Sequence, residues 1–582
     1  MHHLFCAGTR PPITTTLTVL AATLAATSTL RAQIGREGVE RAAPATYAIT
    51  NARIVTAAPN GAPVIEGGTV VIRDGIIRAV GPGSRTAVPA DARVIDGGGL
   101  SVYPGFIDAY SHVGIPAARR EQGGGAPGGG GGGAALASAR GAQETAAPNS
   151  RYPAGLQPEL LAADLLRMDE RSLENERGAG FTTALAVPRE GVFLGRSALL
   201  NLTGGDVQDA LVRPPVALHV GFTPLRGGVY PGSLMGVFAA LRQMLLDAQR
   251  YAQLEEAYER SPRGARRPEH DESLEALLPA LRREMPVVML ASTQREIERA
   301  LDLGKEFGLR VVIAGGNEAY RVADRLAAER VPVIVTLNFP RKPAGGPESQ
   351  EPEPLRVLRE RVETPRNPGR LAQAGVRFSF ATVGMNDLSD VSSNLRTAVE
   401  HGLTKDRAVR ALTLDAAELL GVSDRLGSVE AGKIANLTVV RGDIFEASAR
   451  VTQVFVDGRP IEVRQPTPGA ATGANGQWNV TVTLEGRERA ITLRLTQEGD
   501  RLRGEIQGAL GTSQISNGSI GDSGEVRFTV PLTLATTTEE AVFEGTITGS
   551  SMRGTISIVG QQPGTFVGTR PAGEPRGGAR NP

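Results

Sequence analysis

The sequence predicts an α/β protein built on a (β/α)8-type TIM barrel, with a composite β-sandwich formed from both ends of the barrel region and a C-terminal antiparallel β domain. Three observations support this prediction. Continuous apolar strands alternate with amphipathic helical segments between residues 103 and 425. Short β-rich runs flank that region on both sides, and strict period-two alternation without helical stretches begins at residue 477.

Residues 1–32 predict an export signal. Arg10 precedes an apolar, Thr-rich stretch over 13–30, and Ala32 offers a small residue for cleavage. A retained membrane anchor would need a run of about 20 strongly apolar residues, which this stretch does not supply. We therefore expect an exported protein, periplasmic or secreted, without a membrane span after cleavage. Cys6, the only cysteine, would leave with the signal.

Residues 47–102 and 426–465 predict one composite β-sandwich. Both segments consist of short β-branched runs, and in each an Asp-Gly pair separates two runs, which is a strong hairpin signal. Neither segment is long enough to close a core alone. We therefore expect them to complete one β structure.

Residues 103–425 predict the barrel, and seven of its strands can be placed. These strands are centred near Phe106, Thr183 and Ala217 and on residues 286–290, 311–313, 333–335 and 378–380. The fourth strand in chain order cannot be identified, because residues 232–284 have an almost wholly helical pattern.

The remaining segments are predicted from composition. Residues 119–148 are rich in glycine and indicate a surface loop after the first barrel strand, and 466–476 indicate a Pro/Gly/Ala linker. Residues 477–571 alternate with period two and predict an all-β module, whereas 572–582 predict a disordered tail.

Charge and composition exclude several classes of protein. The chain has 63 basic and 62 acidic residues and no basic run, so we expect no nucleic-acid partner. A single cysteine excludes a disulfide scaffold and a cysteine-rich zinc site. Only six histidines are present, so any metal must be held by imidazole and carboxylate groups.

Residues 103–112, YPGFIDAYSH, resemble the first-strand signature of the amidohydrolase superfamily, P-G-[LF]-I-D-x-H-x-H, in its imidazolonepropionase-like branch. Residues 74–81 resemble the N-terminal hairpin of that family. Residues 411–421 and 427–433 resemble its closing segment, in which Asn436 takes the place of an aspartate. The resemblance covers residues 47–465 and implies a metal-dependent hydrolase of non-peptide C–N bonds, in cyclic or linear amides.

The resemblance also implies a divalent metal, usually zinc, held at the carboxyl ends of the barrel strands. His112 matches one family ligand, but the other ligand positions carry residues that are not metal donors. Tyr110 takes the place of the first histidine and Leu290 that of the fifth-strand histidine. Ala314 or Gly315 takes that of the sixth-strand histidine, and Val383 that of the eighth-strand aspartate. One imidazole cannot form a site that needs three protein ligands.

Two functions therefore remain open. The chain is either an exported hydrolase with a reduced or rearranged metal site, for example one built from His112, Glu318 and Asp387, or a non-catalytic pseudoenzyme that binds a small molecule. The sequence identifies no catalytic residue. The candidates for lining a pocket for a small-molecule substrate or ligand are Tyr110, Glu318, Asn338 and Asp387.

Overall fold

The computed structural model describes most of the chain from residue 46 to residue 570. The described residues are 46–60, 62–116, 150–225, 228–263, 266–340, 353–385, 387–463 and 474–570, the last range with short gaps at 485–486, 499–500, 509–510, 521–523, 535–536 and 559–562. The predicted signal at 1–32, the predicted glycine-rich loop at 119–148, most of the predicted linker at 466–476 and the predicted tail at 572–582 lie outside these residues.

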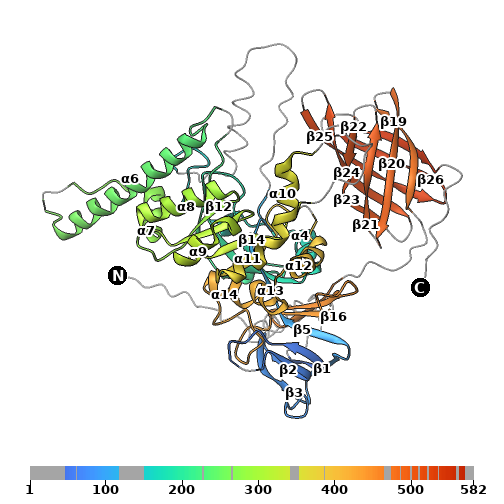
Figure 1. Ribbon diagram of the computed structural model, residues 1–582, viewed down its shortest axis with the longest axis horizontal. Helices are drawn as coiled ribbons and strands as arrows, with labels where there is room; N and C mark the ends of the chain where they lie inside the picture. Colours follow the sequence, from blue (N-terminus) through green and yellow to red (C-terminus); the bar gives the residue numbers. More distant parts are fainter. Residues whose placement is uncertain are drawn as a thin grey trace, which may run out of the picture. The chain divides into compact units, whose positions relative to one another are not determined.

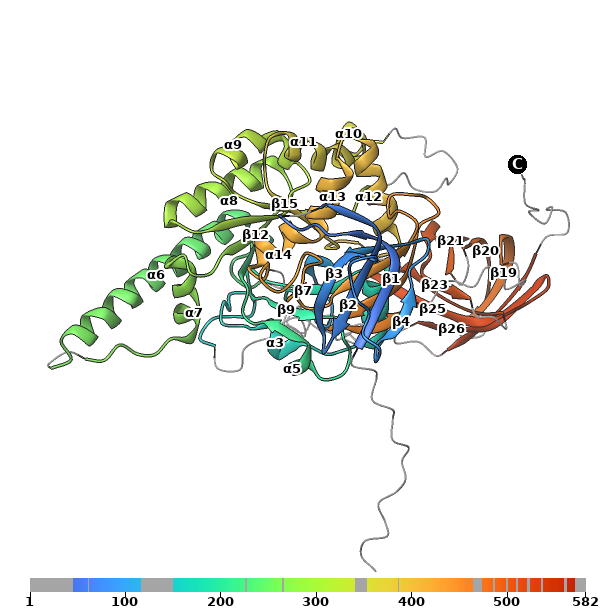
Figure 2. The ribbon, with the colours of Figure 1, turned by 90° about the horizontal axis from the view of Figure 1, so that it is seen from below.

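Strands from both sides of the barrel region form one eight-stranded sheet. The N-terminal strands are β1 (Thr46–Val55), β2 (Val64–Arg73), β3 (Ile76–Pro82), β4 (Arg93–Asp96) and β5 (Leu100–Pro104). The late strands are β16 (Leu437–Arg441), β17 (Arg450–Val456) and β18 (Arg459–Glu462). The strand order is β18-β17-β16-β5-β1-β2-β3, with β4 also paired to β1, so β5 and β16 join the two segments. We call this sheet the composite sheet (Figure 2).

The two Asp-Gly pairs of the composite sheet form the tight hairpins that the sequence predicts. Asp74 and Gly75 connect β2 to β3 with φ angles of 52° and 76°, and Asp457 and Gly458 connect β17 to β18 with φ angles of 50° and 72°. Two consecutive positive φ angles match the right-handed twist of the flanking strands.

A buried asparagine ties the composite sheet to the barrel. Nδ2 of Asn436 donates to Thr183 Oγ1 at 3.0 Å and to Asn201 Oδ1 at 2.8 Å, and its Oδ1 accepts from the Asp457 backbone N–H at 2.8 Å. The amide thus supplies donors and an acceptor together, which an ionised aspartate at this position could not do.

We expect Asn436→Ala to lower the free energy of unfolding by about 2 kcal/mol, because it removes three hydrogen bonds and leaves the Asp457 N–H without its acceptor. Urea denaturation of the purified protein measures this change. Asn175→Ala, at an exposed position on α4 (Glu170–Gly178), is the control and should stay within about 0.5 kcal/mol of wild type. An equal effect of the two substitutions would contradict the role assigned to Asn436.

The barrel strands are parallel and buried on both faces. They are β6 (Phe106–Ser111), β7 (Phe181–Ala186), β11 (Leu218–Gly221), β12 (Val287–Ala291), β13 (Val311–Gly315), β14 (Val333–Thr336) and β15 (Phe378–Ala381). Strands β11 to β15 pair in sequence order, β6 pairs with β7, and β15 lies next to β6. Along each strand, side chains point in turn into the ring and out toward the helices. In β12, Val288 faces inward and Met289 faces the helices.

The third place in the ring, between β7 and β11, differs from the sequence prediction. The strand near Ala217, which sequence order places third, is β11 and stands fourth around the ring. The third place is filled by β8 (Phe193–Arg196) and β9 (Ala198–Asn201), which pair antiparallel with β11 and β7 respectively; β9 also pairs with the short β10 (Leu211–Arg213). The strand missed by the sequence analysis is therefore not in 232–284 but in a broken antiparallel segment upstream of it.

Helices cover the outside of the ring (Figure 1). They are α3 (Ala162–Leu165), α4 (Glu170–Gly178), α5 (Val207–Ala210), α6 (Leu234–Arg260), α7 (Glu272–Leu281), α8 (Gln294–Phe307), η1 (Ala319–Val322), α9 (Ala323–Ala328), α10 (Leu355–Glu363), η2 (Thr364–Arg366), α11 (Asn367–Gln373), α12 (Asp390–Glu400), α13 (Lys405–Leu412) and α14 (Leu414–Leu420). As predicted, residues 232–284 are mostly helical. None of the helices in the described ranges is long and apolar enough to cross a membrane.

The C-terminal module is an antiparallel β barrel, in agreement with the predicted antiparallel β domain. Its strands are β19 (Gly476–Leu484), β20 (Arg487–Glu498), β21 (Arg501–Gly508), β22 (Gly511–Gln514), β23 (Ser516–Ile520), β24 (Glu525–Leu534), β25 (Thr537–Thr548), β26 (Ser551–Ile558) and β27 (Gly564–Thr569). A pairing of β20 with β21 closes the sheet on itself (Figure 1). Trp478 lies in its core, fully buried, and its indole N–H donates to the Ala474 carbonyl at 2.9 Å.

Candidate functional site

Three aromatic rings meet inside the barrel near the carboxyl end of β6. The ring of Tyr110 lies 5.7 Å from that of His112 and 5.3 Å from that of His219, both in edge-on geometry. Tyr110 is 1% exposed, so its phenol is part of the barrel interior. Of the residues proposed from the sequence, Tyr110 and His112 are therefore brought together, and His219 joins them from β11.

His112 is a neutral imidazole. Its Nδ1 lies 2.8 Å from the Val187 carbonyl oxygen, so Nδ1 carries the proton and donates, which leaves Nε2 as the acceptor. Burial lowers the pKa of His112; the hydrogen bond to the Val187 carbonyl opposes this shift, and the neighbouring charge of Arg189 adds to it. The net effect disfavours the imidazolium form.

His219 is also neutral, and it is more deeply buried. Burial lowers its pKa to about 3, with a smaller contribution from His112. Neither ring nitrogen of His219 has a hydrogen-bond partner among the described residues. With 1% exposure and its ring against Tyr110, His219 is a packing residue of the barrel interior.

The positions that the family resemblance assigns to metal ligands lie in one apolar cluster. Tyr110 and Ala314 are buried members of this cluster, and Leu290 and Val383 pack against it. None of the four side chains offers a carboxylate, imidazole or thiolate donor. No group of three His, Cys, Asp or Glu side chains with metal-site spacing occurs in the part of the chain that the structure describes. The donor set at this place therefore does not fit a zinc ion.

Asp108 bridges the first and last strands of the barrel. Its carboxylate accepts from the Thr382 backbone N–H at 3.1 Å, from the Thr382 hydroxyl, and from the Tyr110 backbone N–H at 3.1 Å. Asp108 is fully buried. The contacts give Asp108 a structural role, because they fix β6 against β15.

A second buried carboxyl lies close to Asp108. Glu176 of α4 accepts from the Ser111 hydroxyl at 3.0 Å through Oε1, while its Oε2 has no partner among the described residues. Burial raises the pKa of Asp108 to about 7. Burial, and then the charge of Asp108, raise the pKa of Glu176 well above its usual range. Because several donors favour the ionised form of Asp108, we assign the more strongly held proton to Glu176.

Glu176 and Thr382 were not singled out by the sequence analysis. The signal for Glu176 is its spacing: it follows the buried Leu173 by three positions, which places it on the apolar face of α4. No local pattern indicates the contact between Thr382 and Asp108, because the two residues are 274 positions apart in the chain.

Two of the predicted pocket residues form local hydrogen bonds. Oε2 of Glu318 accepts from the Gln294 backbone N–H at 2.8 Å, at the start of α8. Nδ2 of Asn338 donates to the Gly384 carbonyl at 2.6 Å, and its backbone N–H donates to Thr336 Oγ1 at 3.1 Å. Glu318 follows β13 and Asn338 follows β14. Their polar groups hold a helix start and a turn.

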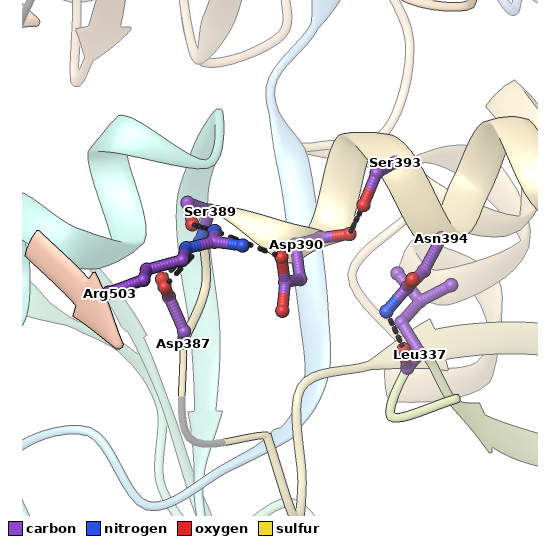
Figure 3. A network of polar contacts seen from close by, with 7 residues as sticks. All are labelled: Leu337, Asp387, Ser389, Asp390, Ser393, Asn394 and Arg503. Carbon is purple, nitrogen blue, oxygen red and sulfur yellow. Dashed lines mark hydrogen bonds and ion pairs between the residues drawn. The ribbon is translucent and has the colours of Figure 1, made fainter. Parts of the chain in front are cut away.

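Asp387, the remaining candidate, lies in an ion-pair network at the start of α12 (Figure 3). Arg503 of β21 places Nη2 at 3.5 Å from Asp387 Oδ2, at 3.3 Å from Asp390 Oδ1 and at 3.1 Å from Ser389 Oγ. Oδ1 of Asp387 accepts from the Ser389 backbone N–H at 2.9 Å. The Asp387 carboxylate is thus engaged by a cation.

The same network continues along α12. The Ser393 hydroxyl donates to the Asp390 carbonyl at 2.9 Å, and Nδ2 of Asn394 donates to the Leu337 carbonyl at 2.8 Å (Figure 3). The Asn394 bond fastens α12 to the segment that follows β14, because it joins side chain to backbone across 57 positions of the chain. This contact orders the region in which Asn338 and Asp387 lie.

Comparison with known proteins supports the amidohydrolase superfamily. Residues 354–461 match the amidohydrolase family profile. The solved amidohydrolase from Thermotoga maritima is similar in fold, with a TM-score of 0.57 and 24% identity over 72% of this chain and 100% of that one. At this identity the likeness establishes the fold.

Two other solved structures give lower scores. A prolidase in complex with N-methylphosphonate-L-proline has 20% identity and a TM-score of 0.42, over 72% of this chain and 100% of the other. A zinc-containing adenosine deaminase from Xanthomonas campestris has 19% identity and a TM-score of 0.41, over 73% of this chain and 95% of the other. The assignment of the fold therefore depends on the Thermotoga structure and the family match.

Proposed function

We propose that this protein is an exported member of the imidazolonepropionase-like branch of the amidohydrolase superfamily that has lost metal-dependent C–N bond hydrolysis and acts by binding a small molecule. One observation carries the proposal: Tyr110, Leu290, Ala314 and Val383, which stand at the expected ligand positions, all belong to or pack against one apolar cluster. The export part of the proposal depends on residues 1–32 alone.

The loss of hydrolysis follows from the donor set. A catalytic metal of this class lowers the pKa of its bound water and polarises the scissile carbonyl, and it needs about three protein ligands to be held. His112 retains an acceptor nitrogen at Nε2, but the residues around it in the barrel are Tyr110 and the neutral, buried His219. His112 and His219 together supply fewer than three ligands, and His219 lies in the buried interior, so zinc binding there is unfavourable.

The binding role is supported by the polar groups that remain at the carboxyl ends of the strands. His112 is only partly buried and its Nε2 can accept a hydrogen bond, while the exposed Asn338 keeps its carboxamide oxygen as an acceptor beside Gly384. Arg189, whose Nη2 donates to the His112 carbonyl at 3.3 Å, places a cation beside the imidazole. We propose a small, polar, uncharged or anionic molecule as the ligand.

We expect the purified mature protein to retain far less than one equivalent of Zn, Mn, Fe or Ni, measured by elemental analysis after gel filtration. His112→Ala should leave the metal content unchanged, and so should His270→Ala, the matched control at an exposed histidine. No amidase or cyclic-amidase turnover is expected from any of the three proteins.

One outcome would reverse the proposal. Stoichiometric metal in the wild type, lost in His112→Ala together with C–N hydrolysis but kept in His270→Ala, would restore the hydrolase with a rearranged metal site. Metal that is present equally in all three proteins would be bound elsewhere and would leave the assignment of the barrel interior unchanged.

A further inference from the structure

A cavity of about 590 Å³ lies at the amino-terminal ends of strands β12 to β15, at the other end of the strands from His112. Its walls come from the residues that lead into these four strands, from the second half of α8 and from α14. Apolar contacts to its interior come from Leu301, Leu309 and Val331. The cavity has the size of a site for a small organic ligand.

Cationic side chains outnumber carboxylates in the lining. The cations are Arg283, Lys305, Arg310, Arg330 and Arg377, and the carboxylates are Glu329, Asp415 and Glu418. Two of the three carboxylates are neutralised by cations that do not line the cavity. Asp415 pairs with Arg407 and Arg410, each at 2.9 Å, and Glu329 pairs with Arg325 at 2.8 Å. The cavity therefore presents a net positive field to a ligand.

Each of the four arginines belongs to the segment that leads into one of four consecutive strands, and they fall into two pairs by position. Arg310 and Arg377 directly precede β13 and β15. Their backbone carbonyls accept from the N–H groups of Val287 and Val333, at 2.9 Å and 3.0 Å. The backbone at Arg310 and Arg377 is thus held in the sheet register, and both side chains start from one edge of the sheet.

Two of these arginines occupy a backbone conformation that favours glycine. Arg283 and Arg330 follow the ends of α7 and α9 with φ angles of 63° and 55°. At the corresponding places after α8 and α11, the chain has Gly308 and Gly375, with φ angles of 67° and 75°. A left-handed conformation is unfavourable for a residue with a Cβ, so the arginines add strain that glycine would avoid. Such strain points to a use for the side chain.

None of the five cations makes an ion pair within the described ranges. Lys305, Arg330 and Arg377 also make no side-chain hydrogen bond there, and all three are exposed. Nη1 of Arg283 donates to the Gly308 carbonyl at 2.8 Å, which leaves further guanidinium donors for a ligand. Planar guanidinium groups bind phosphate and carboxylate groups through paired hydrogen bonds.

We propose that this cavity, which we call the arginine cavity, binds a small organic anion with two or more phosphate or carboxylate groups. The four arginines in the segments before β12 to β15 bind the anionic groups of the ligand, and the apolar wall contacts its carbon skeleton. The arginine cavity involves none of the residues discussed for the carboxyl ends of the strands, so this inference stands apart from the proposed function.

Isothermal titration calorimetry of the full-length mature protein with pyrophosphate and with citrate, at fixed ionic strength, tests the proposal. We expect saturable binding at one site, weakened at least about tenfold by Arg310→Ala and by Arg377→Ala, since each removes a charge-assisted contact. Arg93→Ala, at an exposed arginine of β4, is the matched control and should bind like wild type.

The Arg330→Gly variant distinguishes a role of Arg330 in anion binding from a role in stability. Because glycine relieves the left-handed strain, we expect this variant to have an unchanged or higher melting temperature and yet weaker anion binding. A lower melting temperature with unchanged binding would show that Arg330 is structural and would overturn its assignment. Two results would overturn the small-anion site. One is equal binding of the anions by wild type, Arg310→Ala and Arg377→Ala. The other is a wild-type protein that is retained on a polyanion such as heparin but does not bind pyrophosphate or citrate.

Discussion

Asp108→Ala should lower the free energy of unfolding of the barrel by about 3 kcal/mol. The substitution removes the acceptor shared by the Thr382 N–H, the Thr382 hydroxyl and the Tyr110 N–H. These groups are buried between β6 and β15, where water cannot replace the lost carboxylate without opening the structure. Urea denaturation followed by circular dichroism measures the change.

Two further variants test whether the loss of stability is due to the hydrogen bonds of Asp108. Thr382→Val removes one of the donors and keeps the side-chain volume, so it should cost less, about 1 kcal/mol. Asp324→Ala removes an exposed aspartate of α9 and should stay within about 0.5 kcal/mol of wild type. If Asp108→Ala were no more destabilising than Asp324→Ala, the bridge between the first and last strands would not contribute to stability.

The stability of the wild-type protein should fall as pH rises from about 5 to about 8, because Asp108 and Glu176 hold protons in the folded state. In the unfolded chain both carboxyls have pKa values near 4. In the folded state burial raises the pKa of Asp108 to about 7, and burial with the charge of Asp108 raises that of Glu176 well above its usual range. Between these values the folded protein binds more protons than the unfolded chain.

This difference in bound protons sets the direction in which stability changes with pH. The free energy of unfolding decreases with pH wherever the folded state binds more protons, by up to about 1.4 kcal/mol per pH unit for each carboxyl. The stabilisation is fully present below about pH 4 for this pair and is lost as pH passes through the folded-state pKa values. Other groups titrate as well, so a variant is needed to isolate the pair.

Glu176→Gln provides that variant. It removes one of the two titrations and the charge that opposes ionisation of Asp108, so the decline in unfolding free energy between pH 5 and pH 8 should be reduced to roughly half or less. Glu174→Gln, at an exposed position of the same helix, should keep the wild-type decline. Denaturation curves at four pH values distinguish the two. Parallel curves for wild type and Glu176→Gln would show that the carboxyl pair does not control the pH dependence.

The elements that follow from local chemistry could be predicted from the sequence. The Asp-Gly turns at 74–75 and 457–458 require two positive φ angles, which this residue pair adopts at low cost, and both form the expected hairpins. The apolar strands β12 to β15 have both faces buried and read as continuous hydrophobic runs. The face of α6 that carries Leu241, Met244 and Ala248 is buried as its spacing indicates.

Features that depend on distant contacts could not be predicted. Strands β8 and β9 are four residues each, and nothing in their own sequence indicates that they run antiparallel between β7 and β11. The same limit applies to the candidate site. The substitutions at Tyr110, Leu290 and Val383 can be read from motif positions, but their common apolar cluster, and the pairing of Asp108 with Glu176, appear only in the folded chain.

The composite sheet has a consequence for the order in which the chain folds during synthesis. Strand β5 pairs with β16, and the hydroxyl of Tyr103 donates to an Asp443 oxygen 340 positions away, at 3.2 Å. A growing chain can form β1 to β5 early, but β5 lacks its partner strand until nearly the whole barrel has left the ribosome. In residues 476–569, in contrast, most strands pair with the next strand in sequence, and only β19 with β27 joins the two ends, so this module can fold once β27 has emerged. Completion of the composite sheet is therefore a late, non-local step, and until it occurs β5 is an unpaired sheet edge, the kind of edge at which aggregation begins.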